Sequence, residues 1–290
     1  MIGLALSLLG DLSSSLPVSS VFHRMFMVIY ALPGIFRITL DLYRFDRKIR
    51  HGGLQKAAGW LYNRFYRELD LPPDHRTLLE RPAQPCLYVS NHPGIGDSLA
   101  LLSQIPTENL KILVKSRRFF HMMPELKKYL ILLSPSSRQR IPQMRRARNH
   151  LRDGGSLLMY PAGEIEPDPD LDPLVFPAKP GHWEFPELRV WSRFPRMLLR
   201  DFSRNGQELS VRCCRVSSVY HRRYFRHPFV LSAPTMDDAL SRAAFLSIVY
   251  PRRMEAGVRL RVQAGLSESF SCRAPLEKRE VLREKAPIPG

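Results

Sequence analysis

The sequence predicts an α/β fold, with a mixed, largely parallel sheet flanked by helices. Short apolar runs of strand length alternate with longer segments of helical periodicity between residues 55 and 265. This alternation is typical of parallel sheets, because a crossover between parallel strands needs a helix-length connection. The chain has 290 residues, of which 44% are hydrophobic, so it is long enough to bury a sizeable core.

The individual elements follow from apolar periodicity and from the residues that end each run. Proline and aspartate fill residues 165–187, which predicts a long loop. Residues 119–133 are expected to be helical and then extended. The other expected strands are 86–90, 111–114, 156–160, 209–217 and 258–264. The expected helices are 54–70, one beginning near residue 97, and 141–152, 188–204 and 237–249.

The first 50 residues differ in character from the rest of the chain. Val21 to Leu40 is rich in apolar residues, but its longest uncharged run is only about a dozen residues, against roughly 20 for a membrane span. Pro33-Gly34 is expected to break a helix there. Apolar and aromatic residues with basic flanks favour a helical pair lying in the membrane interface over a core helical hairpin. We therefore divide the chain into an interfacial anchor at 1–50, an α/β domain at 51–266 and a loose polar tail at 267–290.

Charge and cysteine content narrow the possible partners. The formal net charge of +17 attracts anionic lipid headgroups, acidic proteins or nucleic acid, unless the protein is simply a basic enzyme. The four cysteines form no Cys-x-x-Cys pair and have no zinc-ligand spacing. We expect reduced thiols in a cytosolic setting and no metal site.

A histidine and an aspartate flank a glycine-containing turn directly after the strand expected at 86–90. The segment 92–97 reads His-Pro-Gly-Ile-Gly-Asp. Turns at the carboxyl ends of strands place side chains where α/β proteins usually carry their chemistry. A histidine there, with a carboxylate on its second ring nitrogen, is suited to act as a general base. His92 and Asp97 are therefore the candidate catalytic residues, although this spacing alone also arises by chance.

A second segment of the same kind, Tyr160-Pro161-Ala162-Gly163-Glu164, follows another expected strand. Glu164 is expected to bond a polar acceptor headgroup, whereas a lone Gly-Glu is more typical of a solvated turn. Two such segments, each after a strand and about 70 residues apart, are much less expected by chance. No Gly-x-Ser-x-Gly elbow is present, so a nucleophile would come from the substrate.

Together these segments resemble motifs I and III of the glycerolipid acyltransferases, the lysophospholipid and glycerol-phosphate acyltransferases. Motif I of that family is Asn-His-x4-Asp, and Asn91 to Asp97 matches it. The resemblance covers roughly residues 55–220. It implies transfer of a fatty acyl chain from acyl-CoA or acyl-carrier protein to a hydroxyl. It also implies a general base at His92, its partner at Asp97 and acceptor binding by Gly163 and Glu164.

The departures from the family pattern limit what the resemblance implies. Motif III is commonly Phe-Pro-Glu-Gly-Thr-Arg, and here Glu164-Ile165-Glu166 follows the glycine in place of Thr-Arg. We expect the acidic Glu166 to repel a phosphate that the arginine would bind. Motif II is matched loosely by residues 131–138, so Arg138 or Arg140 is the candidate for its phosphate contact. These differences resemble a divergent, hemolysin-like branch of the family, whose acceptor the sequence does not identify.

The basic helix expected at 141–152 is either a solvated face or a dock for phosphates. Arginines interleaved with aromatic residues at 215–226 suit either nucleic acid or the lipid headgroup layer. No nucleic-acid motif accompanies them, so no nucleic-acid partner is expected.

We predict a peripheral acyltransferase at the cytoplasmic face of a membrane, acting on a lysophospholipid or related lipid. Its partners would be an acyl thioester co-substrate and anionic membrane lipids, with no further cofactor. Backbone N–H groups of the turn at 94–96 are expected to stabilise the oxyanion. The alternative is a catalytically silent lipid-binding protein with the acyltransferase fold.

Overall fold

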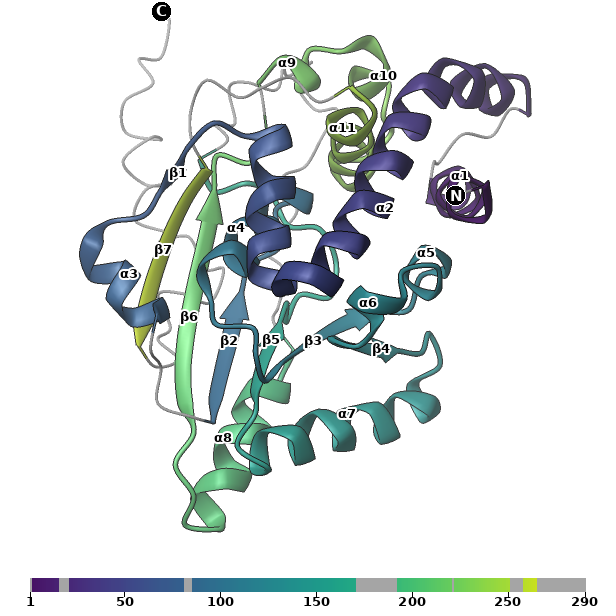
Figure 1. Ribbon diagram of the computed structural model, residues 1–290. Helices are drawn as coiled ribbons and strands as arrows, with labels where there is room; N and C mark the ends of the chain where they lie inside the picture. The colour runs from purple at the N-terminus through teal and green to yellow at the C-terminus, as the bar shows by residue number, and fades with distance from the viewer. Residues whose placement is uncertain are drawn as a thin grey trace, which may run out of the picture.

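The computed structural model describes residues 2–15, 21–80, 85–170, 192–220, 222–250 and 258–264. It shows an α/β protein with one sheet between helical layers (Figure 1). Most of the loop expected at 165–187 and the whole tail expected at 267–290 lie outside the described residues.

Seven strands form the sheet in the described part of the chain, in the order β1-β7-β6-β2-β5-β3-β4. Every neighbouring pair is parallel except β6 and β7, which are antiparallel. This confirms the expected mixed, largely parallel sheet. The strands are β1 Leu69–Asp70, β2 Cys86–Ser90, β3 Leu110–Lys115, β4 Leu130–Leu133, β5 Ser156–Met159, β6 Ser210–Ser217 and β7 Val258–Ala264.

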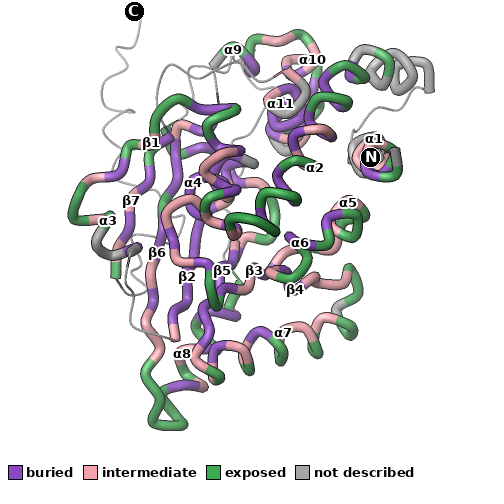
Figure 2. The backbone as a smooth tube through the Cα atoms, viewed as in Figure 1, coloured by how far each residue is buried: buried purple, intermediate pink, exposed green. Residues whose placement is uncertain are grey.

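The central strands β2 and β5 are buried along their whole length, because helices cover both faces of the sheet (Figure 2). Successive side chains alternate between the two faces, so Tyr88 packs with α2 and α4 while Leu87 packs with α7 and α8. The helices are α1 Ile2–Ser15, α2 Val21–Phe65, α3 Pro73–Glu80, α4 Ile95–Gln104, α5 Arg118–His121, α6 Pro124–Lys127, α7 Ser137–Arg152, α8 Phe194–Arg204, α9 Arg222–Phe225, α10 Pro228–Leu231 and α11 Met236–Val249.

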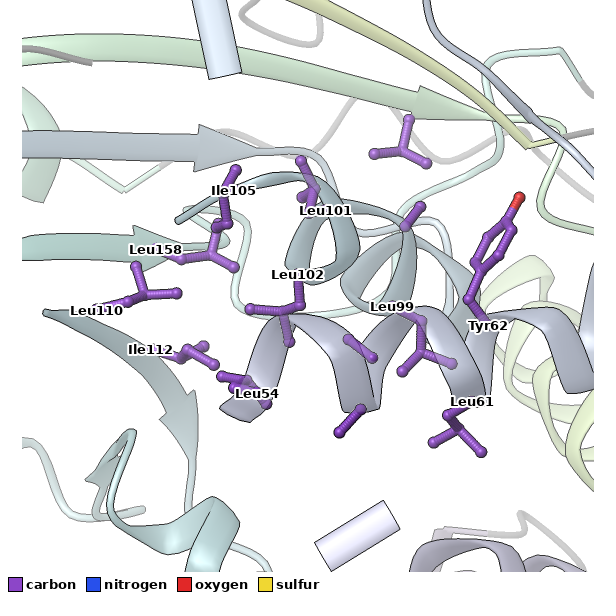
Figure 3. Close-up of a cluster of buried hydrophobic side chains, with 14 of the residues drawn as sticks. Leu54, Leu61, Tyr62, Leu99, Leu101, Leu102, Ile105, Leu110, Ile112 and Leu158 are labelled. Carbon is purple, nitrogen blue, oxygen red and sulfur yellow. The ribbon is translucent and has the colours of Figure 1, made fainter. Parts of the chain in front are cut away.

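The helix that carries the site, α4, is fixed between α2 and the sheet. Leu99, Leu101 and Leu102 of α4 lie between α2 and the strands in the close-up of this core (Figure 3). The cluster also contains Leu54 of α2 and Leu158 of β5. A helix held on two sides by apolar contacts gives its N-terminal turn a fixed position above the sheet.

The expected helix break at Pro33-Gly34 is wrong: α2 runs through both residues. A proline inside a helix leaves the carbonyl four residues earlier without its usual donor. That residue, Ile29, and Pro33 itself are exposed, so water can satisfy the carbonyl. The non-helical residue inside α2 is Gly53, with φ 78° and ψ 166°, a left-handed conformation that favours glycine.

The N-terminal helices contact the α/β core and also leave apolar side chains exposed. Ala31 and Ile35 of α2 are buried with residues of α9 to α11. The opposite face of α2 exposes Ile29, Leu32 and Phe36. Within the described residues, no helix combines the length and the apolar character that a membrane crossing requires.

Candidate active site

The turn after β2 is anchored to the sheet by Asn91. Its side-chain amide donates to the carbonyl of Val216 at 2.8 Å, and its oxygen accepts from the N–H of Val216 at 2.7 Å. The two bonds attach the turn to β6, the parallel neighbour of β2. The backbone that leads into His92 is therefore fixed to β6.

Two aromatic rings explain the glycines of the turn. A Cβ at Gly94 would overlap the phenol of Tyr220, and a Cβ at Gly96 would overlap the phenol of Tyr66. Both tyrosines are buried. Both positions therefore require glycine, because each tyrosine ring packs directly against the backbone there.

The structure brings His92 and Asp97 together. His92 Nδ1 lies 2.8 Å from Asp97 Oδ2, the Asp97 side chain is 0% exposed and the His92 side chain is 28% exposed. An ionised carboxylate only accepts hydrogen bonds, so Nδ1 carries the proton and Nε2 is the basic nitrogen. No described residue forms a hydrogen bond with Nε2. The geometry is that of an oriented general base.

Asp97 is itself held by further hydrogen bonds at the first turn of α4. The N–H of Gly94 donates to its Oδ2 at 3.1 Å, and the Ser98 hydroxyl donates to its Oδ1 at 2.9 Å. The Tyr160 hydroxyl donates in turn to Ser98 at 2.8 Å, and its ring lies 4.7 Å from the His92 ring between centroids. An acid near a helix N-terminus is also favoured by the helix dipole.

This arrangement removes one of the three N–H groups of the turn at 94–96 that were expected to stabilise the oxyanion. The Gly94 N–H is directed at the Asp97 carboxylate, so it is not available to a substrate oxyanion. Its role is to fix the carboxylate that orients His92.

Glu166 also differs from its expected role. Its side chain is buried and accepts the backbone N–H of His92 at 2.8 Å, while its own N–H donates to the His92 carbonyl at 2.8 Å. Glu166 thus clamps the backbone of the turn that carries His92. It faces the backbone of this turn, whereas we expected it to face and repel a phosphate.

The carboxylates around His92 set its basicity. Burial of the ring disfavours its charged form, but Asp97 and Glu166 outweigh burial and the nearby Lys115, and they raise the pKa of His92 above its usual value. Burial also raises the pKa of the Tyr160 hydroxyl, so it remains a hydrogen-bond donor at neutral pH.

The second segment lies beside the first because β5 is the parallel neighbour of β2. Gly163 has a φ of 69°, in the left-handed region that favours glycine. Glu164 is exposed, and its carboxylate lies 3.6 Å from Lys115 Nζ at the end of β3. Gly163 and Glu164 therefore lie at the same edge of the sheet as His92, as parallel strands require.

The two candidate phosphate-binding arginines lie further away. Arg138 and Arg140 follow β4, which is three strand positions from β2 and so roughly 14 Å across the sheet. Arg140 donates to the carbonyls of Ser134 and Pro135 at 2.7 and 2.8 Å, whereas Arg138 is exposed. The structure does not bring either of them into contact with His92.

The aromatic residues of the segment 215–226 are in the core. Tyr220, Tyr224 and Phe225 are all buried, so their rings are unavailable for stacking on nucleic-acid bases. Among the described residues, no group of three histidine, cysteine or acidic side chains is arranged to hold a metal ion.

Sequence reasoning assigned no role to three residues of the site, Ser98, Tyr66 and Tyr220, and it expected a different role for Glu166. Glu166, Tyr66 and Tyr220 act through contacts between segments far apart in the chain, and no local pattern signals such contacts. Ser98 donates to its neighbour Asp97 and also accepts from the distant Tyr160. The spacing of Ser98 next to Asp97 was the one available hint, because a hydroxyl beside an N-terminal acid often completes its hydrogen bonds.

The fold and the site define an α/β protein with an oriented histidine base at the carboxyl edge of its sheet. No protein-family model matches the chain, and no curated protein matches its sequence. Among solved structures, it is similar to the 1-acyl-sn-glycerophosphate (LPA) acyltransferase PlsC from Thermotoga maritima. The two share 14% identity with a TM-score of 0.38, over 88% of this chain and 98% of that chain. A likeness at this level concerns the general course of the chain and says nothing of its activity.

Proposed function

We propose that the protein is an acyltransferase that moves a fatty acyl chain from an acyl thioester to a hydroxyl of a lysophospholipid or related lipid. The observation that carries this proposal is the 2.8 Å bond between His92 Nδ1 and the fully buried Asp97 carboxylate. It leaves Nε2 of a side chain that is 28% exposed as the basic nitrogen. Alcohols are weak nucleophiles at neutral pH, and such a base is what acyl transfer to an alcohol needs.

The proposed reaction follows from these positions. His92 Nε2 takes the proton of the acceptor hydroxyl, whose oxygen attacks the thioester carbonyl and forms a tetrahedral intermediate. The C–S bond then breaks, and the imidazolium returns the proton to the leaving thiolate. Asp97 stabilises the imidazolium while it exists and keeps the ring in the productive tautomer.

The donor would be acyl-CoA or acyl-carrier protein, both of which present the same thioester to the site. Gly163 and Glu164 are proposed to bind the acceptor, because they lie on the strand end next to His92. Arg138 or Arg140 would contact a phosphate only on a substrate that extends across the sheet edge to β4.

We also propose that the protein works at the cytoplasmic surface of an anionic membrane. Support comes from the exposed apolar side chains Ile29, Leu32 and Phe36, which are spaced as one face of α2. Basic Arg37 and Arg44 are exposed on the same helix. Apolar and cationic side chains together on a helix surface suit a lipid headgroup layer.

The test compares cellular lipids with and without the protein, using the full chain and a His92→Ala variant. We expect one class of acylated lipid to appear with the wild type and to be absent with His92→Ala. His51→Ala is the matched control, since His51 is exposed on α2, and it should behave as the wild type. A lipid profile that the wild type leaves unchanged, together with vesicle binding, would support the silent lipid-binding alternative.

A further inference from the structure

A pocket of about 490 Å³ lies between α7 and the β3–β4 edge of the sheet, away from His92. Its volume falls in the range of small-molecule sites. Figure 1 shows α7 passing along this side of the sheet, from the end of β4 to the start of β5. Ile131 of β4 and Pro142 of α7 form the apolar part of its wall.

The charged groups of this α7 pocket are mostly cationic. Lys111, Arg145 and Arg146 line it, and Asp153 is the acid among its lining residues. Its lysine, two arginines and one aspartate give the lining a formal net charge of +2. Asn149 adds an amide that can donate to an anion.

The two arginines have no anionic partner among the residues that the structure describes. Neither Arg145 nor Arg146 forms a hydrogen bond or an ion pair with any residue that the structure describes. Arg152, about two turns further along α7, differs because it is paired with Asp201 at 2.9 Å. No described residue occupies the guanidinium groups of Arg145 and Arg146, so a ligand can contact them.

The lysine of the pocket is held in place, and it is close enough to Arg146 to be affected by it. Lys111 Nζ donates to the carbonyl of Lys128 at 2.5 Å, which fixes the position of the ammonium group. Burial and the charge of Arg146 lower the pKa of Lys111. An anion bound between neighbouring cations attracts each of them and offsets their mutual repulsion.

The C-terminal part of α7, which forms one wall of the pocket, is attached to the sheet by His150. His150 Nε2 donates to the carbonyls of Asn109 and Ser156, both at 3.1 Å. Its ring occupies the space that a side chain at Gly155 would need. The histidine therefore ties the end of α7 to the sheet.

We propose that the α7 pocket binds the phosphomonoester group of a small phosphorylated ligand or of a lipid headgroup, through Arg145, Arg146 and Lys111. A phosphomonoester carries nearly two negative charges at neutral pH, which matches the net charge of the lining. The planar guanidinium groups of two arginines suit the three oxygens of such a group.

This site is separate from the proposed acceptor site. Lys111 and Leu87 both align with Leu157, so Lys111 lies two strands from β2 and five residues below His92. At standard strand dimensions the separation is roughly 19 Å. One phosphate cannot contact both sites, and the inference does not depend on acyl transfer.

The test measures binding of inorganic phosphate and of adenosine 3′,5′-bisphosphate to the full chain by calorimetry. A second arm measures binding to vesicles that contain phosphatidate, with phosphatidylglycerol vesicles as the phosphodiester comparison. The variant is Arg145→Gln/Arg146→Gln, which keeps side-chain size at two exposed positions. The matched control is Arg67→Gln/Arg76→Gln, which removes the same charge from exposed sites near the opposite edge of the sheet.

We expect the α7 variant to lose at least about tenfold in affinity for the bisphosphate or for phosphatidate vesicles, because two charge-assisted contacts are removed. The control should stay within about twofold of the wild type. Loss in the soluble arm identifies a small ligand, and loss in the vesicle arm alone identifies a headgroup. Equal loss in the control, or no phosphomonoester binding by the wild type in either arm, would overturn the inference.

Discussion

Replacement of Asp97 by asparagine removes the charge that supports the His92 base while keeping the shape of the side chain. A 2.8 Å N–O bond places the two charge centres roughly 4 Å apart, where the attraction between imidazolium and carboxylate is about 4 kcal/mol at an effective dielectric constant of about 20. This attraction exists only once His92 has taken the proton. Since about 1.4 kcal/mol corresponds to a tenfold change in rate, Asp97→Asn should lower kcat about a thousandfold.

The assay follows thiol release from the acyl donor at saturating acceptor, with thermal unfolding measured in parallel to verify the fold. KM should change little, because Asp97 is fully buried and does not reach the substrate. Asp74→Asn is the control, since that carboxylate is 74% exposed on α3, and it should keep full activity. An Asp97→Asn protein that is folded and within tenfold of the wild-type kcat would refute the assignment of Asp97 as the partner of the base.

Three further substitutions test the surroundings of the base. Glu166→Gln removes a carboxylate that raises the pKa of His92, so the acid limb of the pH profile of kcat/KM should move to lower pH; a limb that stays in place or rises would contradict this. Gly96→Ala should destabilise the protein by about 1–3 kcal/mol in urea unfolding, because the added Cβ overlaps the Tyr66 phenol; an unchanged midpoint would count against this packing. Asn91→Ala should cost about 2–4 kcal/mol, because two buried backbone groups of β6 lose their partners; a cost below about 1 kcal/mol would show that water replaces them.

Local sequence patterns were sufficient to predict most of the sheet. The run 86–89 of β2 is continuously apolar because β2 is covered on both faces. The expected strands 209–217 and 258–264 also lie within one residue of the observed strands. The order of the strands and the antiparallel pairing of β6 with β7 were not predictable, since both depend on long-range contacts. The two-residue β1 and the short α3 are too brief to produce a periodic pattern.

The site was predictable only in part, for a similar reason. The pairing of His92 with Asp97 follows from five residues of one turn, which a sequence pattern can capture. Glu166 reaches His92 from a segment 74 residues away, and its direction depends on how β5 and β2 lie side by side. The helix break predicted at Pro33 was wrong because a proline is tolerated where its turn faces solvent, and the sequence does not show that exposure.

The central claim is that His92 removes the proton of an acceptor hydroxyl that attacks an acyl thioester. The most direct test incubates the purified full chain with an acyl thioester and a panel of lysophospholipids, and measures free thiol and acylated lipid together. We predict that the wild type forms both in equal amounts with one acceptor, and that folded His92→Ala forms neither above background. Acylated lipid formed by His92→Ala at the wild-type rate would contradict the account.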